Sequence, residues 1–212
     1  MTEHVKPQDI EARSFEIIKA ELDAMGISLD PEQDPVIRRA RHTSADVDYA
    51  ETLFCSPGAV RIAKELIRSG ADIVSDTNMA LTGINKRKLA AYGGSARCYM
   101  ADEDVAAEAK ERGITRASVS MEHAARDARA SGRKTVFSIG NAPTALMTLR
   151  EMHDKGIYTP DFVIGVPVGF VNVVEAKELI LETDIPSKVN RGRKGGSNVA
   201  AAIVNAVLYS MG

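Results

Sequence analysis

Short runs rich in β-branched residues alternate with helical patterns along most of this 212-residue chain. The five strand candidates are ADIVSD from residue 71, ARCYMAD from 96, KTVFSIG from 134, PDFVIGV from 160 and IPSKVN from 185. A strand followed by a crossover helix re-enters the sheet in the same direction, so this order predicts parallel strands with helices on both faces. We therefore predict one α/β domain over residues 1–212, a three-layer sandwich with a mostly parallel sheet of about five strands.

Charge and composition exclude several classes of protein. The formal net charge is -2, so the chain has no overall basic field for nucleic acid, which we do not expect as a partner. No stretch approaches the roughly 20 apolar residues of a membrane span, and the first residues lack a signal-peptide core, which predicts a cytoplasmic protein without membrane contact. Cys55 and Cys98 lie far apart without metal-ligand spacing, so we expect reduced thiols and no metal site.

The first helical pattern covers residues 8–25 and contains an unexpected hydroxyl. Ser14 falls on the same row as the apolar residues Ile10 and Ile18, on the face that should be buried. A serine here either bonds to the backbone of its own helix, which is the more common case, or belongs to a site.

Capping patterns predict where the next helices begin. Two Asp-Pro steps precede a cationic stretch, which indicates a loop feeding a short helix. Thr43 and Asp46 have capping-box spacing, which predicts another helix just after His42. Ser56 and Pro57 are an N-cap and first-turn pair for a helix that closes at residue 70.

Four loops that follow predicted strands contain unusual residues. They read SDTNMALTG from residue 75, GNAPT from 140, GVPVGF from 165 and NRGRKGGSN from 190. Ligands of open parallel sheets bind outside the carboxyl ends of the strands, so we expect all four loops to face one crevice.

The last of these loops is suited to an anion. Arg191, Arg193 and Lys194 precede the free N–H groups at the start of a helix. A solvated loop would carry such cations equally often. The phosphate motifs GxxxxGK[ST] and GxGxxG are absent, so a nucleotide lacks its usual signature and a polycarboxylate stays open.

His42 is the strongest candidate for proton transfer. His4 lies near the terminus, and His123 and His153 lie within helical patterns that make them packing or surface residues. His42 instead stands between an arginine-rich stretch, whose charge favours the neutral ring, and two aspartates with the opposite effect. The residues alone therefore predict an α/β enzyme or a binding protein for a polyanionic organic ligand.

Several segments together resemble the precorrin-8X methylmutase family, which acts late in cobalamin biosynthesis. They are IEARSFEII, RHTSADVDYA, SDTNMALTGINKRKLAAYGGSARCYMAD, GNAPTAL, GVPVGF and GRKGGSNVAAAIVNAVLY. Each is weak alone, but six in the same order cover most of the chain and make a strong signal.

The resemblance implies an isomerase that moves a methyl group from carbon 11 to carbon 12 of precorrin-8X or cobalt-precorrin-8, giving hydrogenobyrinate or cobyrinate. His42 falls on the family's catalytic histidine, with the implied role of proton donor or acceptor. No separate cofactor is implied, because any cobalt arrives inside the corrinoid substrate. The segments SDTNMALTGINK, RCYMAD and GRKGGSN look more like the cobalt-containing branch. A homodimer with the site near the subunit interface is also implied.

The resemblance places Ser14 and Arg39 at substrate-contacting positions. The polar, cationic and glycine residues of the loops suit the acetate and propionate groups on the rim of such a macrocycle. The further predicted substrate-binding residues are Thr43, Asp76, Thr77, Asn78, Asn141, Thr144, Gly192, Arg193, Lys194, Gly195, Ser197 and Asn198.

Two departures from the family pattern affect the site. Arg41 replaces a residue that is commonly apolar, and Asn172, Val173 and Val174 replace small residues after GVPVGF. The bulkier side chains could alter substrate fit. A carrier that holds a tetrapyrrole without turnover remains the alternative to the enzyme.

Overall fold

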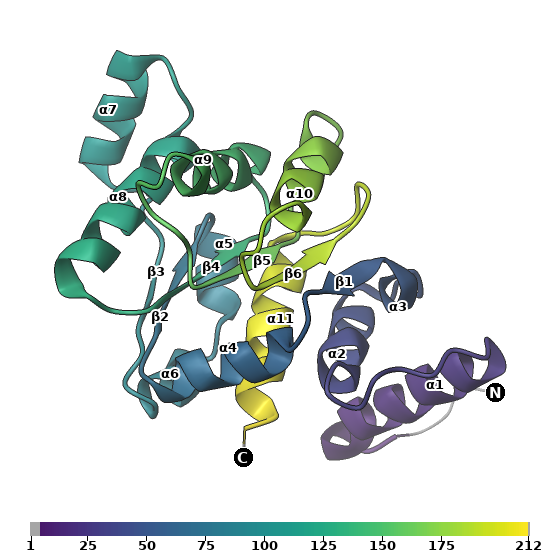
Figure 1. The fold of residues 1–212 in the computed structure, drawn as a ribbon. Coiled ribbons are helices and arrows are strands. Elements are labelled where there is room, and N and C mark those ends of the chain that lie inside the picture. The colour runs from purple at the N-terminus through teal and green to yellow at the C-terminus, as the bar shows by residue number, and fades with distance from the viewer. Residues whose placement is uncertain (1–4, 212) are drawn as a thin grey trace.

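The strands form a single six-stranded sheet in the order β1-β6-β5-β4-β2-β3, seen near the centre of Figure 1. The computed structural model describes residues 5–211, so His4 lies outside the described part. All five predicted strands are present and pair in parallel with one another. The strands are β1 (Leu53–Cys55), β2 (Asp72–Ser75), β3 (Ala96–Arg97), β4 (Thr135–Ile139), β5 (Phe162–Gly165) and β6 (Ser187–Asn190).

Helices cover both faces of the sheet, which confirms the predicted three-layer α/β architecture (Figure 1). One face is covered by α4 (Ala59–Arg68), α5 (Asn78–Gly83), α6 (Lys86–Ala90) and α11 (Ser197–Tyr209). The other is covered by α7 (Glu103–Arg112), α8 (Arg116–Ser131), α9 (Pro143–Asp154) and α10 (Val173–Leu181). Successive residues of a strand feed opposite cores, as Val136 and Phe137 do in β4.

The sixth strand, β1, was not predicted. It has three residues, too few for a periodic signal, and it pairs antiparallel with β6 so that Leu53 lies opposite Asn190. Its side chains alternate, with Leu53 buried and Phe54 40% exposed. The strand closes the edge of the sheet beside the N-terminal helices.

The N-terminal helices α1 (Ile10–Ala24), α2 (Asp34–Ser44) and α3 (Tyr49–Thr52) follow a short 3-10 turn (Pro7–Asp9). Helix α3 lies beside β1, and α1 packs on α2 (Figure 1). Helix α2 packs along α11 in the opposite direction. The Arg39 guanidinium lies 5.4 Å from the ring centre of Tyr209 in the last turn of α11, whereas Asp46, just after α2, pairs with Lys194 ahead of the first turn. The C-terminal end of α2, with His42, therefore lies at the edge where the parallel strands end.

The prediction that a helix begins just after His42 is wrong. His42 and Thr43 lie in the last turn of α2, which ends at Ser44, and Ala45 adopts a left-handed conformation with φ 54°. The apolar face of α2 packs on α11 up to Ala40, and the helix continues through Thr43, the residue expected to cap the next one. The next helix, α3, starts only at residue 49.

The predicted Ser56–Pro57 cap is also wrong. Gly58, with φ 67°, is the residue that precedes α4, because only glycine adopts this conformation without a steric cost. The Ser56 hydroxyl instead accepts a hydrogen bond of 2.9 Å from the N–H of Ser187, so it fastens the start of β6.

Three further features of the described residues bear on function. Within residues 5–211, no helix is long and apolar enough to cross a bilayer, and no group of three or more His, Cys, Asp or Glu side chains is placed to hold a metal ion. Both cysteines are free thiols, Cys55 half-buried and Cys98 buried.

Lys188 is a buried cation in the middle of β6. It is 1% exposed, lies opposite Cys55 in the β1–β6 pairing, and its Nζ has no hydrogen-bond partner among the described residues. Burial lowers the pKa of Lys188 below the usual lysine value, because the low-dielectric core disfavours its charged form.

We predict that Lys188→Met increases the free energy of unfolding at pH 7 by about 1 kcal/mol or more, since methionine fills the space without a buried charge. Between pH 7 and 10 the unfolded chain keeps the Lys188 proton longer than the folded chain does, so wild-type stability gains from rising pH at this site. Denaturant unfolding should show the gap between variant and wild type shrinking over this range. Lys110→Met, at an exposed position of α7, should show no such trend. A constant gap, or a less stable Lys188→Met, would contradict the prediction.

Candidate functional site

The four predicted loops meet at the carboxyl edge of the parallel strands. Asp76, directly after β2, is fully buried and holds the GNAPT turn. Its carboxylate accepts hydrogen bonds of 2.6 to 2.8 Å from the backbone N–H groups of Gly140, Asn141 and Ala142. Burial raises the pKa of Asp76, and the three N–H donors oppose that shift. Both oxygens are thus engaged by the turn, so the side chain positions this loop.

The first and last loops join through two hydroxyls. Thr77 caps α5 by accepting from the N–H of Ala80, and its Oγ1 lies 2.8 Å from the Ser197 Oγ at the start of α11. Gly140 lies so close to Ser197 that a side chain there would stand 2.7 Å from the Ser197 Cα. The start of α11 is therefore fixed between two other loops.

The loop between β6 and α11 is held in place by a lysine of α10 that sequence patterns did not single out. Lys177 of α10 is fully buried and donates from Nζ to the carbonyls of Gly192 at 2.7 Å and Lys194 at 2.8 Å. Burial lowers the pKa of Lys177 to about 8. Gly195 allows the loop to pass the Val166 carbonyl, because a Cβ would lie 2.1 Å from that oxygen.

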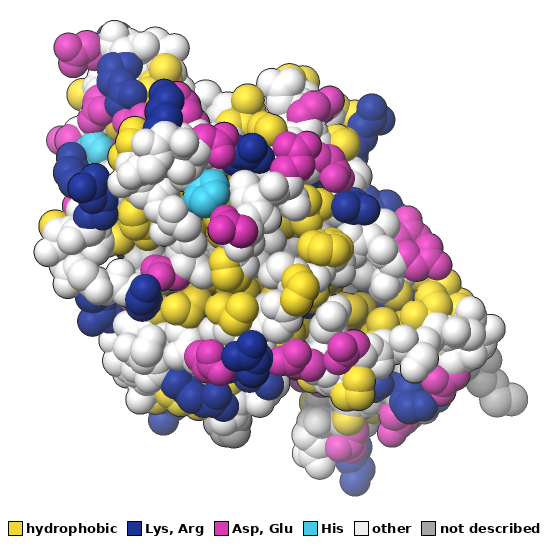
Figure 2. Space-filling view, in the orientation of Figure 1, with side chains coloured by type: hydrophobic (Ala, Val, Ile, Leu, Met, Phe, Trp, Pro, Cys, Tyr) yellow, Lys and Arg dark blue, Asp and Glu magenta, His cyan; other side chains and the backbone are white. Residues whose placement is uncertain are grey.

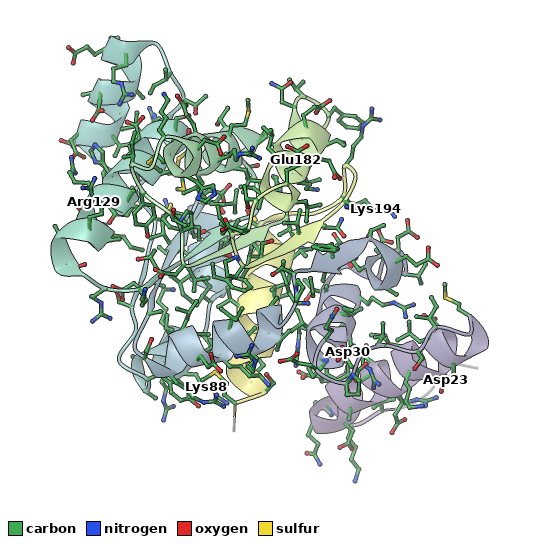
Figure 3. All side chains as sticks on the ribbon, in the orientation of Figure 1. Asp23, Asp30, Lys88, Arg129, Glu182 and Lys194 are labelled. Carbon is green, nitrogen blue, oxygen red and sulfur yellow. The ribbon has the colours of Figure 1, made fainter. Side chains whose placement is uncertain are left out.

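Lys194 connects this loop to the segment after α2. Its Nζ lies 2.7 Å from a carboxylate oxygen of Asp46 and 2.6 Å from one of Asp48, and Figure 3 shows Lys194 on the loop nearest α3. The hydrogen bond from Lys194 lowers the pKa of Asp46, and the two carboxylates raise that of Lys194. These pairs bring the loop between β6 and α11 (residues 191–196, the cationic loop) next to the end of α2.

His42 is hydrogen-bonded to Ser14 across the α1–α2 interface. The Ser14 Oγ and His42 Nδ1 are 2.7 Å apart, and the Phe15 ring lies 5.3 Å from the imidazole, centre to centre. Ser14 therefore faces α2 and does not bond back to its own helix, the alternative that the sequence favoured. With Nδ1 engaged, Nε2 has no hydrogen-bond partner within residues 5–211 and is the nitrogen open to a ligand.

A cavity of about 570 Å³ opens beside His42, between α1 and the end of α2. Ile10, Ile17 and Val47 give it apolar walls, and each is more than 40% exposed. In Figure 2, hydrophobic side chains gather on the surface between α1 and α3, next to charged ones. The polar side chains lining the cavity are Arg13, Ser14, Glu21, Arg41, His42 and Asp46. Such a cavity suits a ligand with an apolar body and a charged rim.

Arg39 lies one turn from His42 but does not line this cavity. Its guanidinium stacks 4.8 Å from the Phe15 ring centre and donates to Glu11 at 2.6 Å, which lowers the pKa of Glu11. Phe15 thus contacts both Arg39 and His42. Sequence patterns did not predict these contacts, because nothing distinguishes Phe15 from a core residue.

The other predicted residues are distributed around the loop cluster. Asn78, Asn141 and Asn198 are exposed at the starts of α5, the GNAPT turn and α11. Arg193 stacks 5.3 Å from the Phe170 ring centre, and Thr144 is hydrogen-bonded to Thr115 at 2.9 Å, on the side of α8. The structure thus brings Ser14 to His42 and the four loops to one another, with Lys194 as the link between the two groups.

Comparison with known proteins gives a consistent result along the chain. The sequence model of the precorrin-8X methylmutase family matches residues 9–210. A cobalt-precorrin-8 methylmutase from Salmonella typhimurium is 42% identical over 209 residues, covering 97% of this chain and 96% of the relative. A precorrin-8X methylmutase from Pseudomonas aeruginosa is 39% identical over 202 residues, covering 94% of each. The crystal structure of a precorrin-8X methyl mutase from Thermus thermophilus has a TM-score of 0.85 at 35% identity, with 96% of both chains covered.

We predict that Asp76→Asn lowers the free energy of unfolding by roughly 2–4 kcal/mol, because an amide cannot accept from all three turn N–H groups and leaves buried donors unpaired. Chemical denaturation measures the loss. Asp184→Asn is the matched control, since the Asp184 side chain is 90% exposed and should tolerate the change. Equal stability of the two variants would show that Asp76 does not hold the turn.

Proposed function

Because the chain belongs to the precorrin-8X methylmutase family, and is an isomerase of cobalamin biosynthesis, we propose that it moves a methyl group from carbon 11 to carbon 12 of the macrocycle with His42 as the proton-transfer residue. The observation that carries the proposal is the Ser14–His42 hydrogen bond beside a cavity with apolar walls. It leaves His42 Nε2 available to a ligand in that cavity.

The reaction does not require the protein to form a covalent bond with the substrate. A methyl shift within a conjugated ring conserves all atoms, so the enzyme has to bind the reactive tautomer and exchange a proton with it. Ser14 holds the imidazole by Nδ1, and Nε2 then gives a proton to the ring or takes one from it. Which of the two comes first, methyl shift or proton transfer, does not alter these roles.

The charges and walls of the site fit a corrinoid. Ile10, Ile17 and Val47 offer apolar contact to the ring, while the β6–α11 loop supplies cations to the acetate and propionate groups of the rim. We assign substrate-binding roles to the loop residues that were predicted from the sequence, with Asp76 acting through the turn that it holds.

We propose that the substrate carries its own cobalt and that no separate cofactor is needed. The segments SDTNMALTGINK, RCYMAD and GRKGGSN support the cobalt-containing branch. Overall identity does not separate the branches, since relatives with either name are about equally similar. The free thiols of Cys55 and Cys98 support action in a reducing compartment, the cytoplasm.

We further propose a homodimer with the site near the subunit interface. Phe170 and Val171, in the loop between β5 and α10, are 82% and 76% exposed, which is unusual for large apolar side chains. Arg193 of the cationic loop stacks on Phe170. A partner subunit seated on Phe170 would therefore lie next to the substrate-binding loop.

We predict that His42→Ala lowers single-turnover conversion by about 10²–10⁴-fold while binding persists, because the proton-transfer group is lost. Ser14→Ala should lower it less, since the imidazole remains but is no longer held. Anaerobic absorbance spectra with cobalt-containing and metal-free substrate report the change in conjugation, and the faster form identifies the branch.

His153→Ala is the control for this experiment, since His153 pairs with Asp184 on the opposite end of the sheet and should keep wild-type rates. Full activity of His42→Ala would reject the role of His42. If the wild type binds the macrocycle but converts neither form, the protein is a carrier and not a methylmutase.

We predict that Phe170→Ser shifts the protein from dimer to monomer at micromolar concentration, because it removes an exposed apolar anchor from the interface. Sedimentation velocity measures the change. Ile157→Ser is the control, since Ile157 is 50% exposed in the α9–β5 connection, away from the cationic loop. A monomeric wild type, or a variant that stays dimeric, would contradict this interface.

A further inference from the structure

Arg41 is a buried cation beside the proposed proton-transfer residue. It precedes His42 in the last turn of α2, lines the same cavity and is 2% exposed. Its Nη2 donates to Glu21 Oε2 at 3.2 Å, a long bond to a side chain that is 52% exposed. Its Nη1 is shielded from solvent and has no hydrogen-bond partner among residues 5–211.

The fold alone does not account for this charge. A guanidinium carries several N–H donors, and the Glu21 bond engages one of them. Burying a cation with donors left over costs free energy that an apolar side chain of similar volume would not cost. The guanidinium thus lacks acceptors within the fold, and an anionic group that enters the cavity would supply them once the side chain turns toward it.

Resting on the proposed function, we propose that Arg41 binds a rim carboxylate of the corrinoid and so selects macrocycles whose side chains are free acids. The planar guanidinium matches a carboxylate with paired N–H donors, whereas a neutral amide offers it a single weaker acceptor. Two protein carboxylates, Glu21 and Asp46, also line the cavity. Neither is bonded to Nη1, because Glu21 accepts from Nη2 of Arg41 and Asp46 is paired with Lys194.

The position of Arg41 also gives it an orienting effect. Arg41 and His42 are adjacent in the chain and line one cavity, whose wall includes Ile10 and Ile17. A carboxylate held at Arg41 fixes one point of the rim, while the apolar wall supports the ring. The macrocycle then binds in a single orientation within the plane of its ring, with one defined edge toward His42. Apolar contacts alone would not distinguish between such orientations.

The test compares binding of cobyrinate with that of its fully amidated form by absorbance titration of wild type and Arg41→Met. We expect Arg41→Met to weaken cobyrinate binding by about 10- to 100-fold and to leave binding of the amidated form unchanged. Its unfolding temperature without ligand should equal or exceed that of the wild type, because a costly buried charge is gone. Arg38→Met is the control, since Arg38 pairs with Asp34 on the same helix outside this cavity.

Two outcomes would overturn the proposal. Equal weakening for both ligands would make Arg41 part of the packing only. Unchanged cobyrinate binding would remove it from recognition altogether. Turnover by the wild type is measured separately. A protein that discriminates acid from amide through Arg41 but converts neither substrate form would support this inference and contradict the proposed isomerase activity.

Discussion

The packing of α11 against its neighbours is the constraint on which the site depends. This helix is apolar along nearly its whole length and contacts α2, α4, α5 and the central strands. Its first residue, Ser197, is clamped between Thr77 and Gly140, and α2 runs antiparallel along its side. One buried helix therefore fixes both the loop at its start and the distance of His42 from that loop.

Two cations of the site, Arg39 and Lys194, are already paired by the protein's own carboxylates. Arg39 is held by Glu11 and Lys194 by Asp46 and Asp48, and these carboxylates are partly exposed. When a polycarboxylate binds here, each cation exchanges a protein carboxylate for a ligand carboxylate. Each such contact therefore contributes less to the binding free energy than a contact to an unpaired cation would. Affinity must then come from several such exchanges on one rigid macrocycle. Arg41 differs from them because part of its guanidinium is free of such competition.

Sequence patterns captured the sheet well because it is built from local signals. Four of the five predicted strands are β-branched runs bounded by turn residues, and their burial follows from that composition. The fifth, β3, has no β-branched residue and is only partly buried. The pattern failed where tertiary packing outweighed local preference. The capping-box spacing after His42 predicted a helix start, but α2, which packs on α11, continues through this position. The strand β1 has three residues, too few for a sequence pattern to detect.

The candidate site was predictable in its parts but not in its contacts. The loops were found because topology places them at one edge of the sheet. The Ser14–His42 bond joins residues 28 positions apart, and no spacing rule relates them. Lys177 was missed for another reason. In VEAKELI it has the appearance of an ordinary surface lysine, and only the fold shows that it reaches two loop carbonyls.

The attachment of Lys177 makes α10 and the cationic loop a single mechanical unit. Asn172 adopts φ 56° immediately before α10, a conformation that asparagine tolerates better than most residues. A change in how that helix begins shifts Lys177, and Lys177 carries the carbonyls of Gly192 and Lys194 with it. Evolution can thus adjust the grip on a substrate from residues that never touch it, by altering the entry angle of a neighbouring helix.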